Sequence, residues 1–381
     1  MARKKTPKQQ NPFICEGYVS PEYFCDRTEE TENMISALRN GRNITLISPR
    51  KIGKTGLIKH VFHQLKEQNK DAICLYVDIF STQNLHEFIE LLSKTIVEDA
   101  LKKERSMMAK VLEAFSSWRP VLSPDPLSGA PTVTVSIDPV KTLPTLKSIF
   151  DHLNSLQKEV YIAIDEFQQI NEYPEKGTEA LLRSHIQFMQ NVGFIFSGSK
   201  QHLMSEMFSS PRRPFYQSTQ FVNLFPLHEE IYYDFARSFF EPRHGDFSKD
   251  VFHDIYERFD GQTWYVQSVL NRLYESGEGA KTVQQANNAI LAVLNTMSVQ
   301  YEGLMAFLTP NQLSLLKAIA RAGCVERPQA TSFIKQYDLP SPSSIKTALD
   351  VLLEKDIIYH TQQGYIVYDR FMQLWLKRIF G

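Results

Sequence analysis

The chain has 381 residues, enough for about two or three domains with hydrophobic cores of their own. Its 42 Lys and Arg balance 43 Asp and Glu, and the net charge of -1 excludes a protein that holds nucleic acid or an anionic membrane by its global field. The 43% hydrophobic and 22% charged residues are typical of a folded globular protein. Four scattered cysteines form neither a zinc-binding pattern nor a disulfide framework.

The N-terminal segment Met1–Pro12 is basic and has almost nothing to bury. We therefore expect a disordered tail, and an arm that contacts nucleic acid is the alternative. No apolar segment follows these charges, and no apolar run in the chain approaches the roughly 18 residues that a bilayer requires. We expect a cytoplasmic protein with no membrane partner.

Helices and short apolar strands alternate in the first half of the chain. This alternation is typical of βαβ units and predicts a doubly wound parallel sheet, an α/β fold. The predicted elements are a helix over Asp26–Asn40, a strand over Asn43–Ser48, a helix over Lys54–Gln68 and a strand over Ala72–Ile79.

A proline-rich stretch interrupts this pattern after a long helix predicted over Leu85–Phe115. We interpret Trp118–Pro144 as an irregular insertion loop with a short strand over Thr132–Ile137, because six prolines are too many for regular internal structure. The sheet is predicted to resume with strands over Val160–Ile164 and Phe194–Phe196, separated by a helix over about Thr178–Asn191.

The C-terminal part has helical periodicity from about Leu227 to Leu294, which predicts a helical domain. Three helices and two short strands then follow in the order of a winged helix-turn-helix. These are predicted over Gln312–Arg321, Gln329–Gln336, Ser343–Lys355, Ile357–His360 and Tyr365–Tyr368. The expected division is a tail over 1–12, a sheet domain over 13–226, a helical lid over 227–303 and a winged helix over 304–381.

A phosphate-binding loop is predicted where an apolar strand ends and a helix begins. Such a loop needs converging backbone N–H groups, a helix N-terminus, a lysine for the β and γ phosphates and a hydroxyl for Mg²⁺. Gly53, Lys54 and Thr55 supply the last parts, although Ser48 stands where the pattern GxxxxGK[ST] has glycine. Ser48 fits only if its φ is negative, and an ordinary loop is the alternative. The candidate binding residues are Ser48, Pro49, Arg50, Lys51, Ile52, Gly53, Lys54, Thr55 and Gly56.

Two adjacent carboxylates, Asp165 and Glu166, end the strand Val160–Ile164 about 110 residues after the phosphate loop. Asp165 is expected to hold hydrated Mg²⁺ beside Thr55. Glu166 is expected to orient and deprotonate an attacking water molecule. The alternative is a pair of acids that merely ends a strand at the solvent boundary.

Together, Gly53-Lys54-Thr55, the Asp165-Glu166 pair and the segment Phe194–Ser199 resemble the Walker A, Walker B and sensor 1 elements of AAA+ ATPases. Within that superfamily, the chain is most similar to STAND-related archaeal-type ATPases, in which a helical lid and a winged helix follow the P-loop core. The resemblance covers roughly residues 23–380 and implies ATP and Mg²⁺ as cofactors. It includes Tyr23–Arg27, similar to the family's segment beside the adenine, which makes Phe24 a candidate contact, and Tyr368–Leu376, similar to its closing signature.

The resemblance further implies that Ser197 or Ser199 senses the γ-phosphate or the attacking water. We prefer Ser199, because Gly198 before it permits a close backbone approach, and an ordinary turn is the alternative. Trp264 and Tyr265 lie in the segment Asp260–Gln267, which is similar to the family's lid motif with Thr263 in place of proline. They are expected either to stack near adenine or to pack in the core.

An arginine finger is the least specific assignment. Arg213 lies in the segment Ser210–Tyr216, where the family can present an arginine to phosphate in cis or across a subunit boundary. The Gly-Arg pair that often follows such a segment is replaced by Gln217-Ser218. Solvated loop charge is the alternative, and the chain is expected to be a monomer or a nucleotide-dependent oligomer.

The winged helix carries only nine basic against six acidic side chains over residues 304–381. That is a weak footprint for a DNA reader, which usually neutralises several phosphates. We therefore favour a module that binds protein or packs within the chain, with DNA as the weaker alternative.

Three functions compete for this sequence. The preferred one is an ATP-hydrolysing molecular switch in which Mg-ATP repositions the winged helix for an unidentified protein partner. The second is a DNA-binding regulator, or a replication or transposition helper, that ATP licenses for DNA contact. A small-molecule kinase is third, and the Asp165-Glu166 pair argues against it because it favours water as the phosphoryl acceptor.

Overall fold

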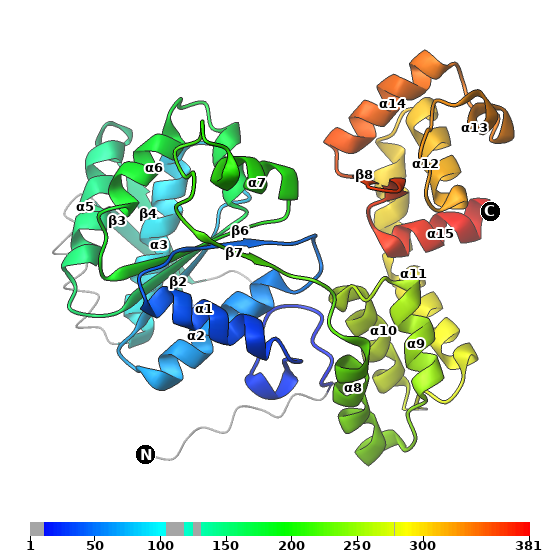
Figure 1. Cartoon of the computed structure of the whole chain (residues 1–381), viewed down its shortest axis with the longest axis horizontal. Coiled ribbons are helices and arrows are strands. Elements are labelled where there is room, and N and C mark those ends of the chain that lie inside the picture. Colours follow the sequence, from blue (N-terminus) through cyan, green and yellow to red (C-terminus); the bar gives the residue numbers. More distant parts are fainter. Residues whose placement is uncertain (1–10, 104–117, 125–130, 278) are drawn as a thin grey trace. The chain divides into compact units, whose positions relative to one another are not determined.

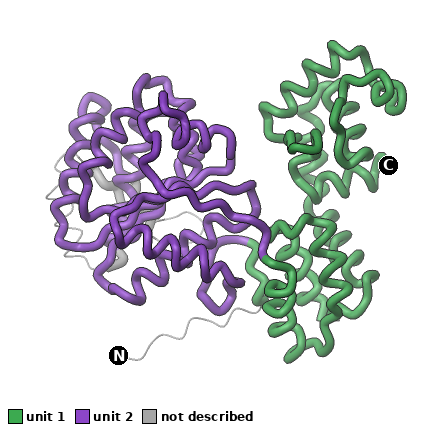
Figure 2. Tube along the Cα trace, viewed as in Figure 1, with its two compact units in different colours: residues 1–15, 228–381 green, residues 16–227 purple. Residues whose placement is uncertain are grey.

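The computed structural model describes residues 11–103, 118–124, 131–277 and 279–381. It divides the chain into two compact units, unit 1 with residues 1–15 and 228–381 and unit 2 with residues 16–227 (Figure 2). The tail predicted over 1–12 therefore falls mostly outside the described residues. Among these residues, no helix is both long and apolar enough to span a bilayer.

Unit 2 is built on a five-stranded sheet whose strands all run parallel, as the sequence predicts (Figure 1). The strands are β1 Ile44–Ile47, β2 Ile73–Asp78, β5 Val160–Asp165, β6 Val192–Gly198 and β7 Gln220–Asn223. Their order in the sheet is β2-β5-β6-β1-β7. Every residue of β1, β5 and β6 is buried, which explains why these strands are mostly apolar rather than alternating. The edge strand β7 is absent from the sequence prediction.

Helices cover both faces of this sheet. Residues of α1 Thr28–Arg39 and α2 Lys54–Gln68 form one hydrophobic core with β1. Residues of α3, α5, α6 and α7 form a second core with β2, β5 and β6. These helices span Leu85–Lys103, Thr142–Ser155, Thr178–Ile186 and Gln201–Ser209, with short 3-10 helices η1 Pro21–Tyr23, η2 Pro139–Lys141 and η3 Phe167–Glu172.

The segment predicted as an irregular loop contains an antiparallel hairpin of β3 Trp118–Pro124 and β4 Pro131–Ile137. The strand predicted over Thr132–Ile137 is confirmed, whereas the irregular structure predicted over 118–124 is wrong. In a two-stranded ladder every second N–H points outward, so a proline such as Pro120 need not remove a ladder bond. The helix predicted over Leu85–Phe115 is α3 up to Lys103, and residues 104–117 lie outside the described part of the chain.

Unit 1 contains a helical part and a winged helix. The helical part comprises α8 Glu229–His244, α9 Lys249–Arg258, α10 Thr263–Ser276 and α11 Val283–Ala306. The winged helix has the predicted three helices and hairpin, α12 Pro310–Ala322, α13 Thr331–Gln336, α14 Pro342–Glu354, β8 Ile358–Thr361 and β9 Gly364–Val367. It ends in α15 Arg370–Phe380, which periodicity did not predict. Helix α11 continues unbroken across residues 303 and 304, where the sequence places a domain boundary.

The start of α15 packs directly on the helical part of unit 1. The ring of Phe371 lies 5.0 Å from the rings of both Phe259 and Tyr265. The backbone N–H of Arg370 donates to the hydroxyl of Tyr265 at 3.1 Å, and its guanidinium pairs with Asp260. These contacts fasten the winged helix to the turn between α9 and α10.

The first described residues of the chain belong to this helical part as well. Asn11 donates to the carbonyl of Asn271 at 2.9 Å, and Asn271 donates back to the carbonyl of Phe13 at 2.7 Å. The Phe13 side chain is fully buried, and four aromatic rings surround it at centroid distances of 5.3 to 6.5 Å. These rings belong to Phe235, Phe239, Phe240 and Tyr274.

Candidate functional site

The predicted phosphate loop joins β1 to α2. Gly53 caps the helix with φ 103°, a conformation that side chains with a Cβ rarely adopt, and Lys51 has φ 67°. Ser48 is not among the residues with positive φ, so it meets the condition under which serine can replace the first glycine of the motif. The loop thus precedes a helix of 15 residues whose first N–H groups have no intrahelical acceptor. This arrangement suits an anion.

Lys54, at the first position of α2, is 7% exposed. Its Nζ lies 3.5 Å from the carbonyl oxygen of Ser48, within the same loop. Burial lowers the pKa of Lys54, as does the charge of Arg50, whereas the carboxylates of Glu166 and Asp165 oppose that shift. The ammonium group therefore lies in a desolvated site close to both predicted carboxylates.

Asp165, the last residue of β5, is the centre of a hydrogen-bond network. Its Oδ2 accepts from the hydroxyl of Tyr76 at 2.5 Å and from that of Thr55 at 3.2 Å. Its Oδ1 accepts from the hydroxyl of Ser197 and from the backbone N–H of Glu166 at 3.0 Å. The structure thus joins the phosphate loop, through Thr55, to the predicted acidic pair.

The oxygens of Thr55 and Asp165 are hard donors of the kind that Mg²⁺ prefers. They lie 3.2 Å apart at the end of the phosphate loop, beside the place where the loop N–H groups would hold phosphate. The residues present therefore fit a magnesium ion shared with a phosphate chain.

Glu166 follows in the left-handed region, with φ 55°. Its Oε2 accepts from the Ser199 hydroxyl at 2.8 Å and from the Ser199 N–H at 3.3 Å. The hydroxyl of Ser199 also accepts from Nε of Arg50 at 3.3 Å. Ser199, predicted as a sensor, therefore links the second carboxylate to the phosphate loop.

Phe24 comes before α1 in the chain, and its ring packs against the first turn of α2 at Gly56. Its ring stacks on His60 at 4.3 Å, and a Cβ added at Gly56 would lie 3.4 Å from it. The hydroxyl of Tyr18 is 3.0 Å from Nδ1 of His60. Burial raises the pKa of Tyr18 to about 12, and burial together with the charge of His63 lowers that of His60. Phe24, Tyr18 and His60 thus form an aromatic cluster beside the phosphate loop.

Two family models match the chain. Residues 24–269 match a family described as an ATPase domain predominantly from Archaea. The chain belongs to this ATPase family. A second match, over residues 299–378, is to a family described as a probable winged helix domain.

Solved structures show the fold of the whole ATPase-family chain. A Walker-type ATPase of Pyrococcus abyssi is similar with a TM-score of 0.62 at 17% identity, over 96% of this chain and 99% of that one. The ORC1 protein of Aeropyrum pernix, solved in complex with DNA, has a TM-score of 0.56 at 12% identity, over 98% and 97% of the two chains. The ORC2 protein of the same organism, solved in ADPNP-ADP complexes, has a TM-score of 0.50 at 18% identity, over 97% and 98%. No curated protein matches the sequence.

Arg213 pairs with acidic residues outside the candidate site. Its guanidinium lies 2.8 Å from Oε2 of Glu179 and 3.7 Å from Oε1 of Glu206, and it donates to Asn171 at 2.5 Å. Burial raises the pKa of Glu179, and the charge of Arg213 opposes that shift. Within unit 2, the structure therefore does not bring Arg213 to the phosphate loop.

Trp264 and Tyr265, which the sequence places either near adenine or in the core, lie in α10 of unit 1. Tyr265 is 1% exposed, and its ring stacks on that of Phe259 at 5.6 Å. Trp264 lies 5.7 Å from the ring of Phe371, measured between centroids. Of the two alternatives that the sequence leaves open, the structure favours core packing for Tyr265.

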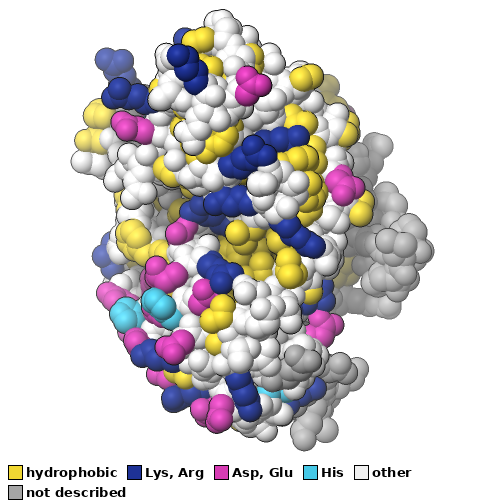
Figure 3. All heavy atoms as spheres, turned by 90° about the vertical axis from the view of Figure 1, so that its right-hand side faces the viewer, with side chains coloured by type: hydrophobic (Ala, Val, Ile, Leu, Met, Phe, Trp, Pro, Cys, Tyr) yellow, Lys and Arg dark blue, Asp and Glu magenta, His cyan; other side chains and the backbone are white. Residues whose placement is uncertain are grey.

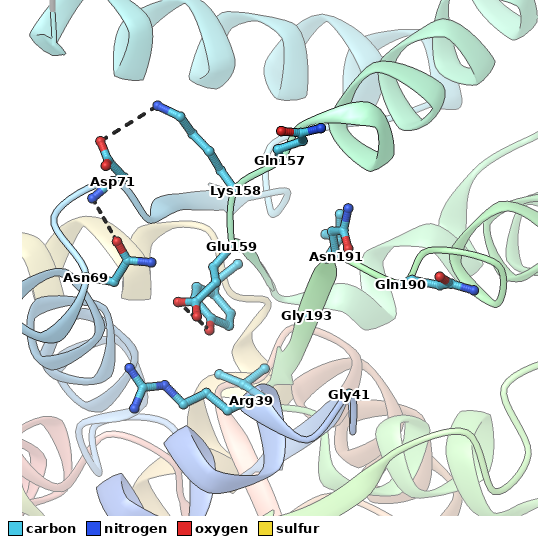
Figure 4. A pocket seen from close by; sticks show the side chains of 13 residues that line it. Arg39, Gly41, Asn69, Asp71, Gln157, Lys158, Glu159, Gln190, Asn191 and Gly193 are labelled. Carbon is cyan, nitrogen blue, oxygen red and sulfur yellow. Dashed lines mark hydrogen bonds and ion pairs between the residues drawn. The ribbon is translucent and has the colours of Figure 1, made fainter.

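A polar pocket of about 890 Å³ opens at the other end of the ATPase sheet. It is lined by residues that precede β2, β5 and β6, and Figure 4 shows the ion pair of Lys158 and Asp71 at its rim, at 3.8 Å. Arg39, from the end of α1, also lines it. Ligands of parallel α/β sheets bind at the carboxyl ends of the strands, where Asp165 lies, so this pocket is not the candidate site.

Sequence reasoning missed two polar partners of the acidic pair. Tyr76 lies in β2, and its register opposite Ala163 brings its hydroxyl to Asp165. Burial and the charge of Asp165 raise the pKa of Tyr76. Gln168 follows Glu166 by two residues and donates to its Oε2 at 2.5 Å. A polar side chain next to a predicted catalytic acid is the signal that would have found Gln168, whereas Tyr76 required the strand order.

Proposed function

We propose that the chain binds Mg-ATP at the carboxyl edge of the unit 2 sheet and hydrolyses it to ADP and phosphate. The observation that carries this proposal is the 3.2 Å hydrogen bond from Thr55 to Asp165, with Glu166 next in the chain. A hydroxyl at the start of the P-loop helix and a carboxylate at the end of a neighbouring strand are the two protein groups that hold Mg²⁺ in P-loop ATPases.

Each residue of the site has a separate task in this proposal. Backbone N–H groups of residues 50–53 and the Lys54 ammonium bind the phosphates. Bound Mg²⁺, held by Thr55 and Asp165, would neutralise phosphate charge. Glu166 accepts a proton from the attacking water, and Ser199 holds its carboxylate. Phe24 and its aromatic cluster provide a surface on which adenine can stack.

The cycle of ATP binding and hydrolysis would serve to change a surface that a partner binds rather than to transform a metabolite. ATP binding would close the helical lid and reposition the winged helix, and hydrolysis would reset it, so that a partner protein meets two different surfaces. This is the behaviour expected of a STAND-type ATPase. An arginine from a neighbouring chain could complete the site in a nucleotide-dependent oligomer, and Arg213 is our candidate, provided that it exchanges its present acidic partners.

Two variants test the assignment of the site. Lys54→Ala should abolish binding of a fluorescent ATP analogue, because the loop loses its buried cation. Glu166→Gln should keep binding of the analogue and stop phosphate release, since an amide cannot accept the proton. Normal phosphate release by Glu166→Gln would contradict the assignment of the base.

Phosphate release by the unmodified chain must also occur without any added acceptor. That result would count against the small-molecule kinase, in which another molecule takes the phosphoryl group.

ATP-licensed DNA binding is the second candidate function. Helix α14, which would enter a major groove, carries Lys346 as its one basic side chain. Figure 3 nevertheless shows Lys and Arg side chains gathered among hydrophobic ones on one face of the molecule. Helices α12 and α15 pack together and carry Lys317, Arg321, Lys377 and Arg378. These four cations favour a nonspecific phosphate contact over base recognition by α14.

Gel shifts with a DNA duplex, with and without ATP and over a range of salt concentrations, separate the two functions. The switch predicts no shift that depends on salt. A shift that needs ATP and weakens with salt, and that Lys377→Ala reduces, would support the DNA-binding function instead.

A further inference from the structure

Gln168 is buried in η3, 4% exposed, on the turn that follows the catalytic strand β5. Its Nε2 donates to Oε2 of Glu166 at 2.5 Å. An ionised carboxylate can only accept, so the amide presents its NH₂ group to Glu166. No ATP-binding motif accounts for this contact.

The carboxylate of Glu166 is held through one oxygen only. Its Oε2 receives three donors from two segments of the chain, Nε2 of Gln168 together with the hydroxyl and the N–H of Ser199. Its Oε1 makes no hydrogen bond within the described residues. Three converging donors fix the rotation of the carboxylate and leave its second oxygen to accept a proton from water.

The other end of the Gln168 amide shows that this contact is built at a cost. Its Oε1 is buried and has no hydrogen-bond partner among the described residues. It lies against Gly198, where a Cβ would overlap it and would lie 2.7 Å from Cγ of Met204. Buried polar atoms are nearly always paired, and an apolar side chain of the same length would fill this space without an unpaired oxygen. Packing alone therefore does not explain a glutamine at this position.

We infer that Gln168 is a positioning residue for ATP hydrolysis, which holds the Glu166 carboxylate so that Oε1 faces the attacking water. Gly198 provides the space in which the amide lies. The inference rests on the proposed function, in which Glu166 is the base. Gln168 itself touches neither nucleotide nor water in this role, and it acts through Glu166.

The test is Gln168→Met, which keeps the length of the side chain and removes both the donor and the unpaired oxygen. Steady-state phosphate release should show kcat lowered by about 10- to 100-fold, because the base loses one of the groups that orient it. The Kd for a fluorescent ATP analogue should not change, and the melting temperature should be unchanged or higher. Gln168→Glu, which places a second carboxylate beside Glu166, should lower kcat at least as much.

The matched control is Gln169→Met. Gln169 is the next residue of the same turn, but its Nε2 donates to the carbonyl of Thr82 at 3.2 Å and not to Glu166. Its substitution should leave kcat at the unmodified value. Adding Gln168→Met to Glu166→Gln should lower the residual rate no further, because Gln168 acts only through the carboxylate.

The outcomes separate this inference from the function on which it rests. If Glu166→Gln releases phosphate at the normal rate, Glu166 is not the base and the inference falls with that assignment, although ATP hydrolysis itself stands. If Glu166→Gln is inactive while Gln168→Met keeps normal kcat, the inference alone is overturned. A weaker Kd with unchanged kcat overturns it as well, since that result would assign Gln168 to binding.

Discussion

Tyr76 and Thr55 donate to the same carboxylate oxygen, Oδ2 of Asp165, from two different elements of unit 2. The hydroxyl of Tyr76 comes from β2 and that of Thr55 from α2, so this one oxygen ties a strand to the P-loop helix. Asp165 is 4% exposed, so these donors take the place of water around its carboxylate.

Tyr76→Phe should therefore destabilise unit 2 even without nucleotide. A hydrogen bond to a charged group contributes about 1.5–3 kcal/mol, and we expect the free energy of unfolding in urea to fall by this amount. Tyr216→Phe is the control, because Tyr216 is 38% exposed. Equal stability of the two variants would show that the Tyr76 hydroxyl does not support Asp165.

Asp78 should make stability depend on pH. Burial raises its pKa above the ordinary 3.8, and the charges of Asp165 and Glu166 add to this shift, while the bond from the Phe80 N–H opposes it. A carboxyl group with a raised pKa in the folded state stabilises folding at low pH and loses that contribution as the pH rises through the raised value. At pH 7 the ionised Asp78 side chain therefore lowers the stability of the folded chain.

Asp78→Asn should accordingly raise the melting temperature at pH 7 by a small amount, and the gain should disappear as the pH falls below 3.8. Asp71→Asn, at the amino end of the same strand, should show no such gain, because the Asp71 carboxylate lies 3.8 Å from the ammonium group of Lys158. A gain that is constant over the whole pH range would contradict the role of charge.

Arg213→Ala should lower the stability of unit 2, because Glu179 loses its 2.8 Å partner. We expect a loss of about 1.5–3 kcal/mol in the free energy of unfolding, against little change for Arg212→Ala, which replaces an exposed side chain.

Mixing the Arg213→Ala and Glu166→Gln variants tests whether Arg213 acts as an arginine finger in a neighbouring chain. Recovery of phosphate release in the mixture would require Arg213 to act in the site of a neighbouring chain, and no recovery would exclude that role.

Phe13→Ala should destabilise unit 1. The side chain is fully buried among four aromatic rings, and removing it leaves a cavity that costs about 3–5 kcal/mol. Thermal unfolding measures the loss, and Phe188→Ala is the control, because that ring is 72% exposed. Comparable melting temperatures would mean that the N-terminal residues do not support unit 1.

The sequence predicts the parts of the candidate site that depend on local order. The P-loop lies between consecutive elements, and Asp165 and Glu166 end an apolar strand, so chain order alone predicts them. The sequence does not predict the role of Tyr76, because that role depends on β2 lying beside β5. Several strand orders suit the same alternation of helices and strands.

Contacts between distant residues account for the other omissions. Phe13 packs against Phe240, more than two hundred residues later, and nothing near Phe13 indicates such a partner. The sequence does not predict strand β3, because a high proline content favours irregular structure. A two-stranded ladder nevertheless has outward positions for proline. The position of Gln168 next to Glu166 is visible in the sequence, but its packing against Gly198 at the end of β6 is not.

The unbroken course of α11 limits where a nucleotide-driven change can occur. A continuous helix of 24 residues has no joint at residues 303 and 304, and Arg378 of α15 donates to Asn295 in its middle at 3.0 Å. In the proposed switch, the winged helix and the helical part would therefore move together. The chain passes from one unit to the other after Cys15 and after Leu227, so such a movement would have to be accommodated at these two places.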